Sequence, residues 1–103
     1  MAEQSGFFHI VYFYMRPGAS AEALAAGCRK FLAGIPGVRR LEVGFPAGTP
    51  RLVVDNSYGV VLFVELPDKE AHDVYQEHAD HKAFIAECSA LWDRVQIYDS
   101  LMQ

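Results

Sequence analysis

The first third of the chain carries two contrasting hydrophobic patterns. From Phe7 to Met15 nearly every residue is aromatic, aliphatic or β-branched, and Arg16-Pro17-Gly18 follows, which predicts a strand ended by a turn. Ser20 can cap the next segment, where apolar residues recur at helical spacing on one face: Leu24, Cys28, Phe31, Leu32 and Ile35. Gly34 and Pro36-Gly37 predict the end of this helix.

The rest of the chain predicts three more strands and two more helices. The strands are expected at residues 38–45, 58–66 and 95–98. A loop through Pro50 and a segment at 51–57 that is assigned to no element lie between the first two of these strands. A second helix opens at Pro67-Asp68 and carries Ala71, Val74, Tyr75 and His78 on one side. After a break near Ala79-Asp80 a third helix runs to about Trp92. The order β-α-β-β-α-α-β predicts an α+β fold, the ferredoxin-like split β-α-β with a four-stranded antiparallel sheet.

The strands indicate that both faces of this sheet are buried. A strand with one face in water alternates apolar and polar residues, but residues 7–15 and 60–64 are apolar on both faces. Helices in so short a chain cover one face only, so the other is expected to pack on a second copy and close a dimeric α+β barrel. The predicted interface consists of Phe8, Ile10, Tyr12, Tyr14, Val61 and Phe63. The alternative is a monomer that binds a ligand on an exposed aromatic sheet.

Composition narrows the class of protein. The 103 residues, 51% of them hydrophobic, predict one domain over 1–103 with an ordered core of about 7–100. The net charge is −4 and no basic run exceeds Arg39-Arg40, so no nucleic-acid partner is expected. No apolar run is long enough for a membrane span, and the polar Met1–Gly6 favours a cytoplasmic location. Cys28 and Cys88 are interpreted as reduced core residues, with a disulfide between their helices as the alternative.

The segment from Ala71 to Lys82 holds the only cluster in the sequence with acid–base capacity near neutral pH. His81 shares a helical face with apolar residues, so its imidazole is expected to be buried and neutral, as a proton acceptor must be. Tyr75 lies six residues earlier on the same side, and its hydroxyl can donate to a carbonyl oxygen that becomes negatively charged. The structural alternative makes Tyr75 a packing anchor and His81 a core residue bonded to a carbonyl or to Tyr75.

The other histidines are assigned from their place in the pattern. His9 is on the helix-facing side of the first strand and can reach the same cavity, His78 bonds or caps the helix break, and His72 is expected to face solvent. Without a nearby carboxylate or thiolate, His78 and His81 predict no metal site, and no cofactor is expected. Trp92 is a core residue or the wall of a small apolar pocket.

Several short motifs, in order and spacing, resemble one protein family. They are His9-Ile10-Val11, Ile35-Pro36-Gly37-Val38 with Leu41-Glu42-Val43-Gly44, Tyr75 with His78-x-x-His81-Lys82-Ala83-Phe84, and a terminal strand ending at Asp99. The chain resembles the stress-responsive A/B barrel family of dimeric α+β barrel proteins. Where that family usually has His-Pro-Ala-His, this chain has His78-Ala79-Asp80-His81. The resemblance implies a small homodimer with a stress-related role and no assigned reaction.

One branch of that family, the olivetolic acid cyclases, closes a linear polyketide with a tyrosine and a histidine, and Tyr75 and His81 match those positions. Cys28 and Val60 stand where that branch has a pocket tyrosine and a histidine. Phe84 and Trp92 match aromatic or apolar residues that line the pocket of that branch. The predicted pocket comprises His9, Val11, Cys28, Leu62, His78, Phe84 and Trp92. Three hypotheses follow: a protein that binds a small apolar ligand, a cyclase-like acid–base enzyme, and a cofactor-free monooxygenase of the wider superfamily.

Overall fold

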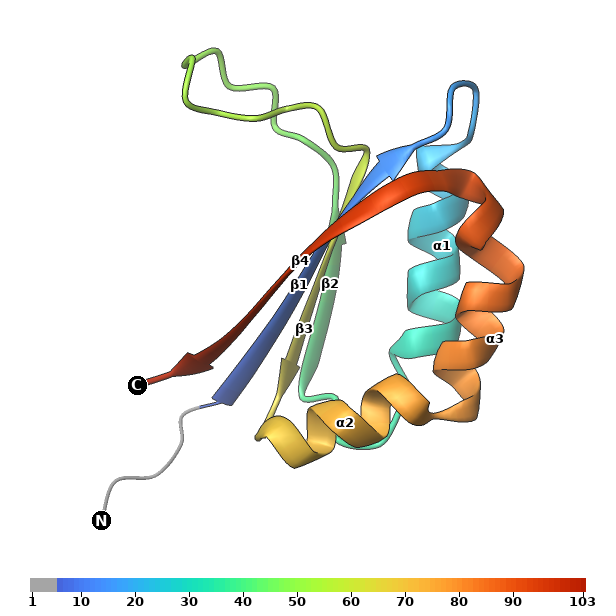
Figure 1. The fold of residues 1–103 in the computed structure, drawn as a ribbon, viewed down its shortest axis with the longest axis vertical. Coiled ribbons are helices and arrows are strands. Elements are labelled where there is room, and N and C mark those ends of the chain that lie inside the picture. Colours follow the sequence, from blue (N-terminus) through green and yellow to red (C-terminus); the bar gives the residue numbers. More distant parts are fainter. Residues whose placement is uncertain (1–5) are drawn as a thin grey trace.

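The computed structural model describes residues 6–103, so the first residues of the predicted domain lie outside it (Figure 1). Its elements follow the order β1 (Gly6–Met15), α1 (Ala21–Leu32), β2 (Arg40–Gly44), β3 (Val60–Leu66), α2 (Lys69–Glu77), α3 (Ala79–Cys88), a short 3-10 helix (Ser89–Leu91) and β4 (Trp92–Met102). This order confirms the predicted ferredoxin-like α+β fold.

The strands form one antiparallel sheet in the order β2-β3-β1-β4. The central strand β1 places His9 opposite Val64 of β3 and opposite Asp99 of β4. All the helices lie on one side of the sheet, while the connection between β2 and β3 projects from the other side (Figure 1). A histidine and an acid far apart in sequence therefore meet on neighbouring strands.

The core lies between the helices and one face of the sheet. Alternate residues of β1 and β3 are buried there against α1, Tyr75 of α2 and Phe84 of α3. The opposite face carries the six predicted interface residues, which a single chain leaves only half-buried. Apolar character on both faces of the sheet is therefore confirmed, and one of the two faces remains uncovered in the isolated chain.

Polar side chains fix where the helices begin. The Ser20 hydroxyl accepts from the backbone N–H of Ala23 at 3.0 Å, and the Asp68 carboxylate accepts from that of Ala71 at 2.9 Å. His78 has an extended backbone (ψ 145°) that ends α2, and its Nδ1 accepts from the N–H of Asp80 at 3.0 Å to begin α3. Among residues 6–103, no helix has the length and apolar character needed to cross a membrane.

Some predicted boundaries are wrong. The third helix ends at Cys88 and not near Trp92, and the last strand begins at Trp92 and runs to Met102 instead of covering 95–98. Residues 51–57 form no strand, which agrees with the four strands predicted. Val74, expected on the inner side of the second helix, is 56% exposed. Among the described residues the last strand pairs with β1 alone, which explains why its sequence is too polar to be recognised as a strand over its full length.

The two cysteines lie at the contact between α1 and α3. Both are free and buried, which confirms the prediction of reduced core residues. The Sγ of Cys88 is so close to Gly27 that a Cβ added there would meet it at 2.5 Å. Burial raises the pKa of the Cys28 thiol to about 12, so this thiol stays protonated and unreactive at neutral pH.

Candidate functional site

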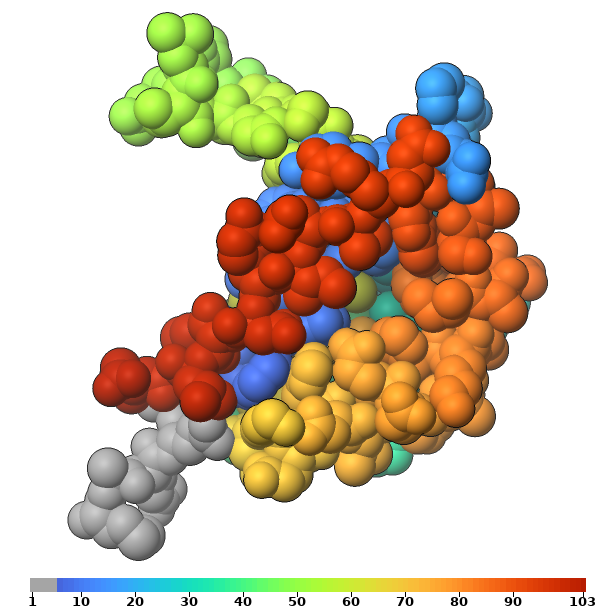
Figure 2. Space-filling model, in the orientation of Figure 1, coloured from blue at the N-terminus to red at the C-terminus, as the bar shows by residue number. Residues whose placement is uncertain are grey.

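A cavity of about 180 Å³ opens between β4 and the helices α2 and α3. Figure 2 shows the hollow between the red β4 and the orange helices, with blue β1 behind it. Its polar lining comes from two imidazoles and one amide, and the rest is apolar. The lining residues are His9, Val11, Phe13, Gln76, His81, Phe84, Ile85, Trp92, Val95 and Ile97.

Tyr75 lies behind the cavity wall rather than on it. Its side chain is fully buried, and its ring meets the rings of His9 and His81 at centroid distances of 5.6 and 5.1 Å, both edge-on. The hydroxyl has no hydrogen-bond partner among the described residues. Burial raises the pKa of this phenol, so the hydroxyl keeps its proton and remains a hydrogen-bond donor.

His81 sits in the first turn of α3 and is half-buried, so it is less enclosed than the sequence predicts. Burial lowers the pKa of His81, which favours the neutral imidazole at physiological pH. The Tyr75 hydroxyl does not bond to the His81 imidazole, and the rings of these two residues make an edge-on contact only. No described residue forms a hydrogen bond with the His81 ring. The imidazole is therefore free to accept a proton or a hydrogen bond from a molecule in the cavity.

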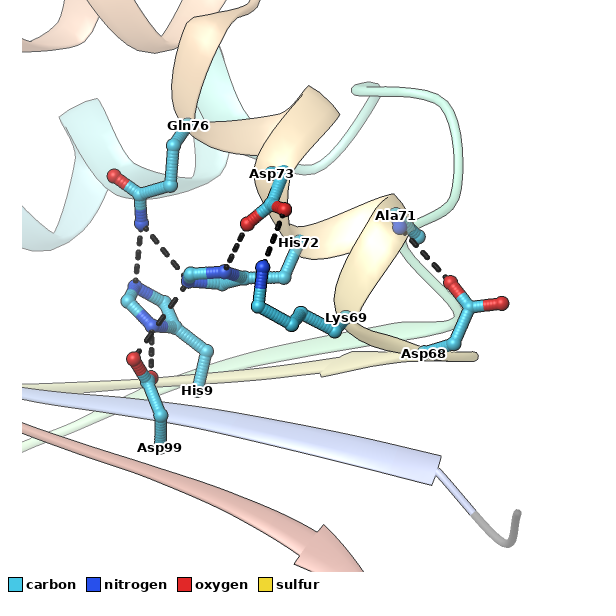
Figure 3. A network of polar contacts seen from close by, with 8 residues as sticks. All are labelled: His9, Asp68, Lys69, Ala71, His72, Asp73, Gln76 and Asp99. Atoms are coloured by element: carbon cyan, nitrogen blue, oxygen red, sulfur yellow. Dashed lines mark hydrogen bonds and ion pairs between the residues drawn. The ribbon is translucent and has the colours of Figure 1, made fainter.

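His9 is held by a partner that sequence reasoning did not identify. Its Nδ1 lies 2.6 Å from Oδ1 of Asp99, and its Nε2 lies 3.4 Å from the amide nitrogen of Gln76 (Figure 3). Burial lowers the pKa of His9, and the Asp99 carboxylate opposes this effect without cancelling it. With Nδ1–H donating to Asp99, Nε2 is an acceptor beside the cavity, where it receives a long hydrogen bond from the Gln76 amide that a ligand hydroxyl can replace.

His72 is not solvent-facing, which corrects the prediction. Its side chain is 14% exposed, its ring stacks on Phe7 at 4.5 Å, and its Nε2 lies 3.3 Å from the Gln76 amide. The reason is that α2 crosses the end of the sheet (Figure 1). The face of α2 that carries His72 and, one turn later, Gln76 is therefore directed towards β1. The nearest sequence signal is the spacing of His72, Tyr75 and Gln76, which places all three on one face of a helix.

The residues predicted for the pocket are distributed over three environments. His9, Val11, His81, Phe84 and Trp92 line the cavity. Cys28 and Leu62 are buried in the core beneath it, and His78 caps the helix junction with its ring 30% exposed. The structure thus brings the predicted histidine pair and Tyr75 together, and the assignment of these residues to a ligand site stays a prediction.

These features define a ferredoxin-like domain with a small cavity beneath its helices. The sequence profile of the stress responsive A/B barrel domain matches residues 7–101, and the chain belongs to this family. No curated protein matches the chain by sequence.

Several solved structures share the fold. A dimeric ferredoxin-like protein of unknown function from Thermobifida fusca has a TM-score of 0.78 at 19% identity, covering 99% of this chain and 100% of its own. A dabb family protein from Mesorhizobium loti has a TM-score of 0.74 at 22% identity, with 96% and 99% covered. The hydroxynitrile lyase from Passiflora edulis has a TM-score of 0.80 at 10% identity, with 95% and 94% covered. The predicted resemblance to olivetolic acid cyclases is not confirmed by these comparisons.

Proposed function

We propose that the protein binds a small, mainly apolar molecule in the cavity between β4 and the helices, and that His9 and His81 provide its polar contacts. The observation that carries the proposal is the pairing of an apolar lining with two imidazoles that burial keeps neutral. A small number of polar groups in an apolar cleft is typical of ligand sites.

The size and chemistry of the cavity restrict the ligand. Drug-sized molecules occupy pockets of roughly 300–1,000 Å³, so a cavity of about 180 Å³ fits a molecule the size of a single ring. Neutral imidazoles accept a hydrogen bond at one nitrogen and donate at the other, whereas the lining offers no cation to pair with a carboxylate. The favoured ligand is an uncharged aromatic or alicyclic alcohol or ketone.

The second part of this proposal is a homodimer formed through the open face of the sheet, where Phe8, Ile10, Tyr12, Tyr14, Val61 and Phe63 lie. These residues are half-buried in a single chain, and contiguous apolar surface of this kind marks an interaction site. The Thermobifida fusca structure of the same fold is described as dimeric, which supports the proposal.

The chain contains its own probe for ligand binding, because its single tryptophan, Trp92, lines the cavity. Titration with cyclohexanol, cyclohexanone or phenol is expected to change Trp92 fluorescence with saturation. The variant Ile97→Phe adds ring atoms to the lining and should abolish the change. The matched control Val74→Phe introduces the same side chain at an exposed position of α2 outside the cavity and should leave the change intact. Equal responses in both variants would contradict the proposed site.

A second candidate function is acid–base catalysis by His81 and Tyr75. The observation in its favour is the buried Tyr75 hydroxyl, which lacks a partner and lies beside two imidazoles. In this scheme His81 removes a proton from the carbon next to a carbonyl, the electron pair moves to the carbonyl oxygen, and Tyr75 donates a hydrogen bond to the resulting enolate. The wall ring of His9 or His81 must turn aside for the hydroxyl to reach the cavity. One similar structure is a hydroxynitrile lyase, so the same fold accommodates a lyase.

Proton abstraction is measured directly as exchange of the α-protons of cyclohexanone for deuterium, followed by NMR. Catalysed exchange that disappears in His81→Asn and persists in His78→Asn would support the enzyme, since His78 lies outside the cavity. Exchange at the buffer rate, together with saturable binding in the fluorescence titration, would leave ligand binding as the function.

A further inference from the structure

Three donor side chains from three different elements converge beneath α2, next to the cavity but on the far side of the His9 ring. They are His9 of β1, His72 of α2 and Asp99 of β4, and one ligand atom from each lies within 4.8 Å of the others (Figure 3). We propose that these residues bind a divalent transition-metal ion of the zinc class. The ion would lie between β1, β4 and α2, where it would join the edge strand to the helix layer.

The geometry directs the two nearest nitrogens towards one carboxylate. Nδ1 of His9 lies 2.6 Å from Oδ1 of Asp99, and Nε2 of His72 lies 3.8 Å from Oδ2 of the same side chain. Two imidazoles with one carboxylate form a donor set that occurs in sites for divalent transition metals. An ion bound here replaces the proton that His9 and Asp99 now share.

The supporting groups suit metal-binding imidazoles. Nδ1 of His72 lies 3.5 Å from Oδ1 of Asp73, so a proton on Nδ1 leaves the lone pair of Nε2 directed at the cluster. A carboxylate on the outer nitrogen of a ligating histidine orients the ring and raises its basicity. The other oxygen of Asp73 is held by the Lys69 amine at 2.7 Å, which fixes this carboxylate in place.

Gln76 can form a hydrogen bond with His9 both when Nδ1 of His9 carries a proton and when it binds a metal ion. Its amide nitrogen now lies 3.4 Å from Nε2 of His9 and 3.3 Å from Nε2 of His72. When a metal takes Nδ1 of His9, the proton moves to Nε2, and a half-turn of the Gln76 amide brings its oxygen into position to accept that proton. The side chain that faces both rings can therefore satisfy His9 with or without metal.

The donor set determines the class of ion. Two imidazoles and one carboxylate suit zinc, cobalt or nickel, whereas magnesium and calcium prefer oxygen donors. Burial also favours binding, because the His9 and His72 side chains are only 3% and 14% exposed, while Asp99 at 39% leaves a route for the ion. Three protein donors are one fewer than in closed structural zinc sites, which leaves a coordination position for water or for a ligand atom.

The test is a calorimetric titration of the full chain, without a polyhistidine tag, with zinc chloride and with cobalt chloride. We expect one ion per chain, cobalt absorption bands of low-coordinate geometry, and a loss of affinity of at least about tenfold in His72→Asn and in Asp99→Asn. His78→Asn is the matched control, because His78 and Asp80 also form a histidine–aspartate pair, with Nδ1 and Oδ2 3.8 Å apart. Its affinity should equal that of the wild type.

The site is overturned if the wild-type chain binds no zinc at micromolar concentrations, if His72→Asn binds as well as the wild type, or if only His78→Asn loses binding. Asn can take the place of either side chain without adding volume, and the far-ultraviolet circular dichroism of both variants should match the wild type. The metal site shares His9 with the proposed ligand cavity, but His72 does not line that cavity, so the His72 variant separates the two proposals. In excess chelator, the Trp92 fluorescence titration should therefore be unchanged in His72→Asn.

Discussion

The buried hydroxyl of Tyr75 gives the most decisive prediction, because replacing Tyr75 by Phe is expected to stabilise the protein. A buried hydroxyl without a partner costs about 1–3 kcal/mol, while the variant loses only the dispersion contacts of one oxygen atom, a few tenths of a kcal/mol. The free energy of unfolding should therefore rise by about 1 kcal/mol. In a domain of this size such a gain raises Tm by roughly 4–8 °C.

The assay is urea unfolding at fixed protein concentration, pH 7 and excess chelator, followed by circular dichroism. A higher midpoint with an unchanged slope would show that the native state gained stability. The neighbouring variant Phe84→Leu removes buried ring carbons and should lower the midpoint, which establishes that the assay detects changes in this part of the core. If Tyr75→Phe loses about 0.5–1.5 kcal/mol instead, the hydroxyl is hydrogen-bonded in solution and the reasoning is refuted.

Three further predictions concern other parts of the molecule. Gly27→Ala should lower the free energy of unfolding by about 1–2 kcal/mol, because the added Cβ meets the Sγ of Cys88. The same change in a Cys88→Ala background should be neutral or stabilising, and denaturant unfolding measures both. Burial lowers the pKa of His81, so as the pH falls the imidazole is protonated in the unfolded chain before it is protonated in the folded one. The stability of the fold should therefore decrease as the pH drops below about 6.5, and His81→Asn should weaken this pH dependence in thermal unfolding scans. Ile10→Lys should produce a particle of 11.5 kDa in light scattering, and Val74→Lys should not; a wild-type mass of 11.5 kDa would remove the case for a dimer.

The fold could be predicted because its strongest signals are local. The aromatic and β-branched run of β1, the Ser20 cap and the Asp68 cap each act within a few residues of sequence. The predicted order of elements then left few topologies to choose from. The last strand was only partly recognised, since an edge strand paired with β1 alone tolerates polar residues along much of its length.

The candidate site was predicted in part for a related reason. Tyr75 and His81 belong to adjacent helices, and the motif around them is visible in the sequence. The contact between His9 and Asp99 depends on the register of two strands separated by most of the chain, which no local pattern specifies. The inward position of His72 depends on how α2 crosses the sheet, and a short helix with a polar sequence gives no clear sign of that direction.

His78 joins α2 and α3, the two helices that carry most polar side chains of the site. His72, Tyr75 and Gln76 are carried by α2, His81 and Phe84 are carried by α3, and the only change in direction between these helices occurs at His78. The angle between the two helices is therefore set at one backbone position, where ψ is 145°. Substitutions that alter the backbone here, unlike His78→Asn, which keeps a side chain able to accept from the Asp80 N–H, would reshape the cavity while every lining side chain stayed the same. This offers a route to altered ligand preference from outside the pocket.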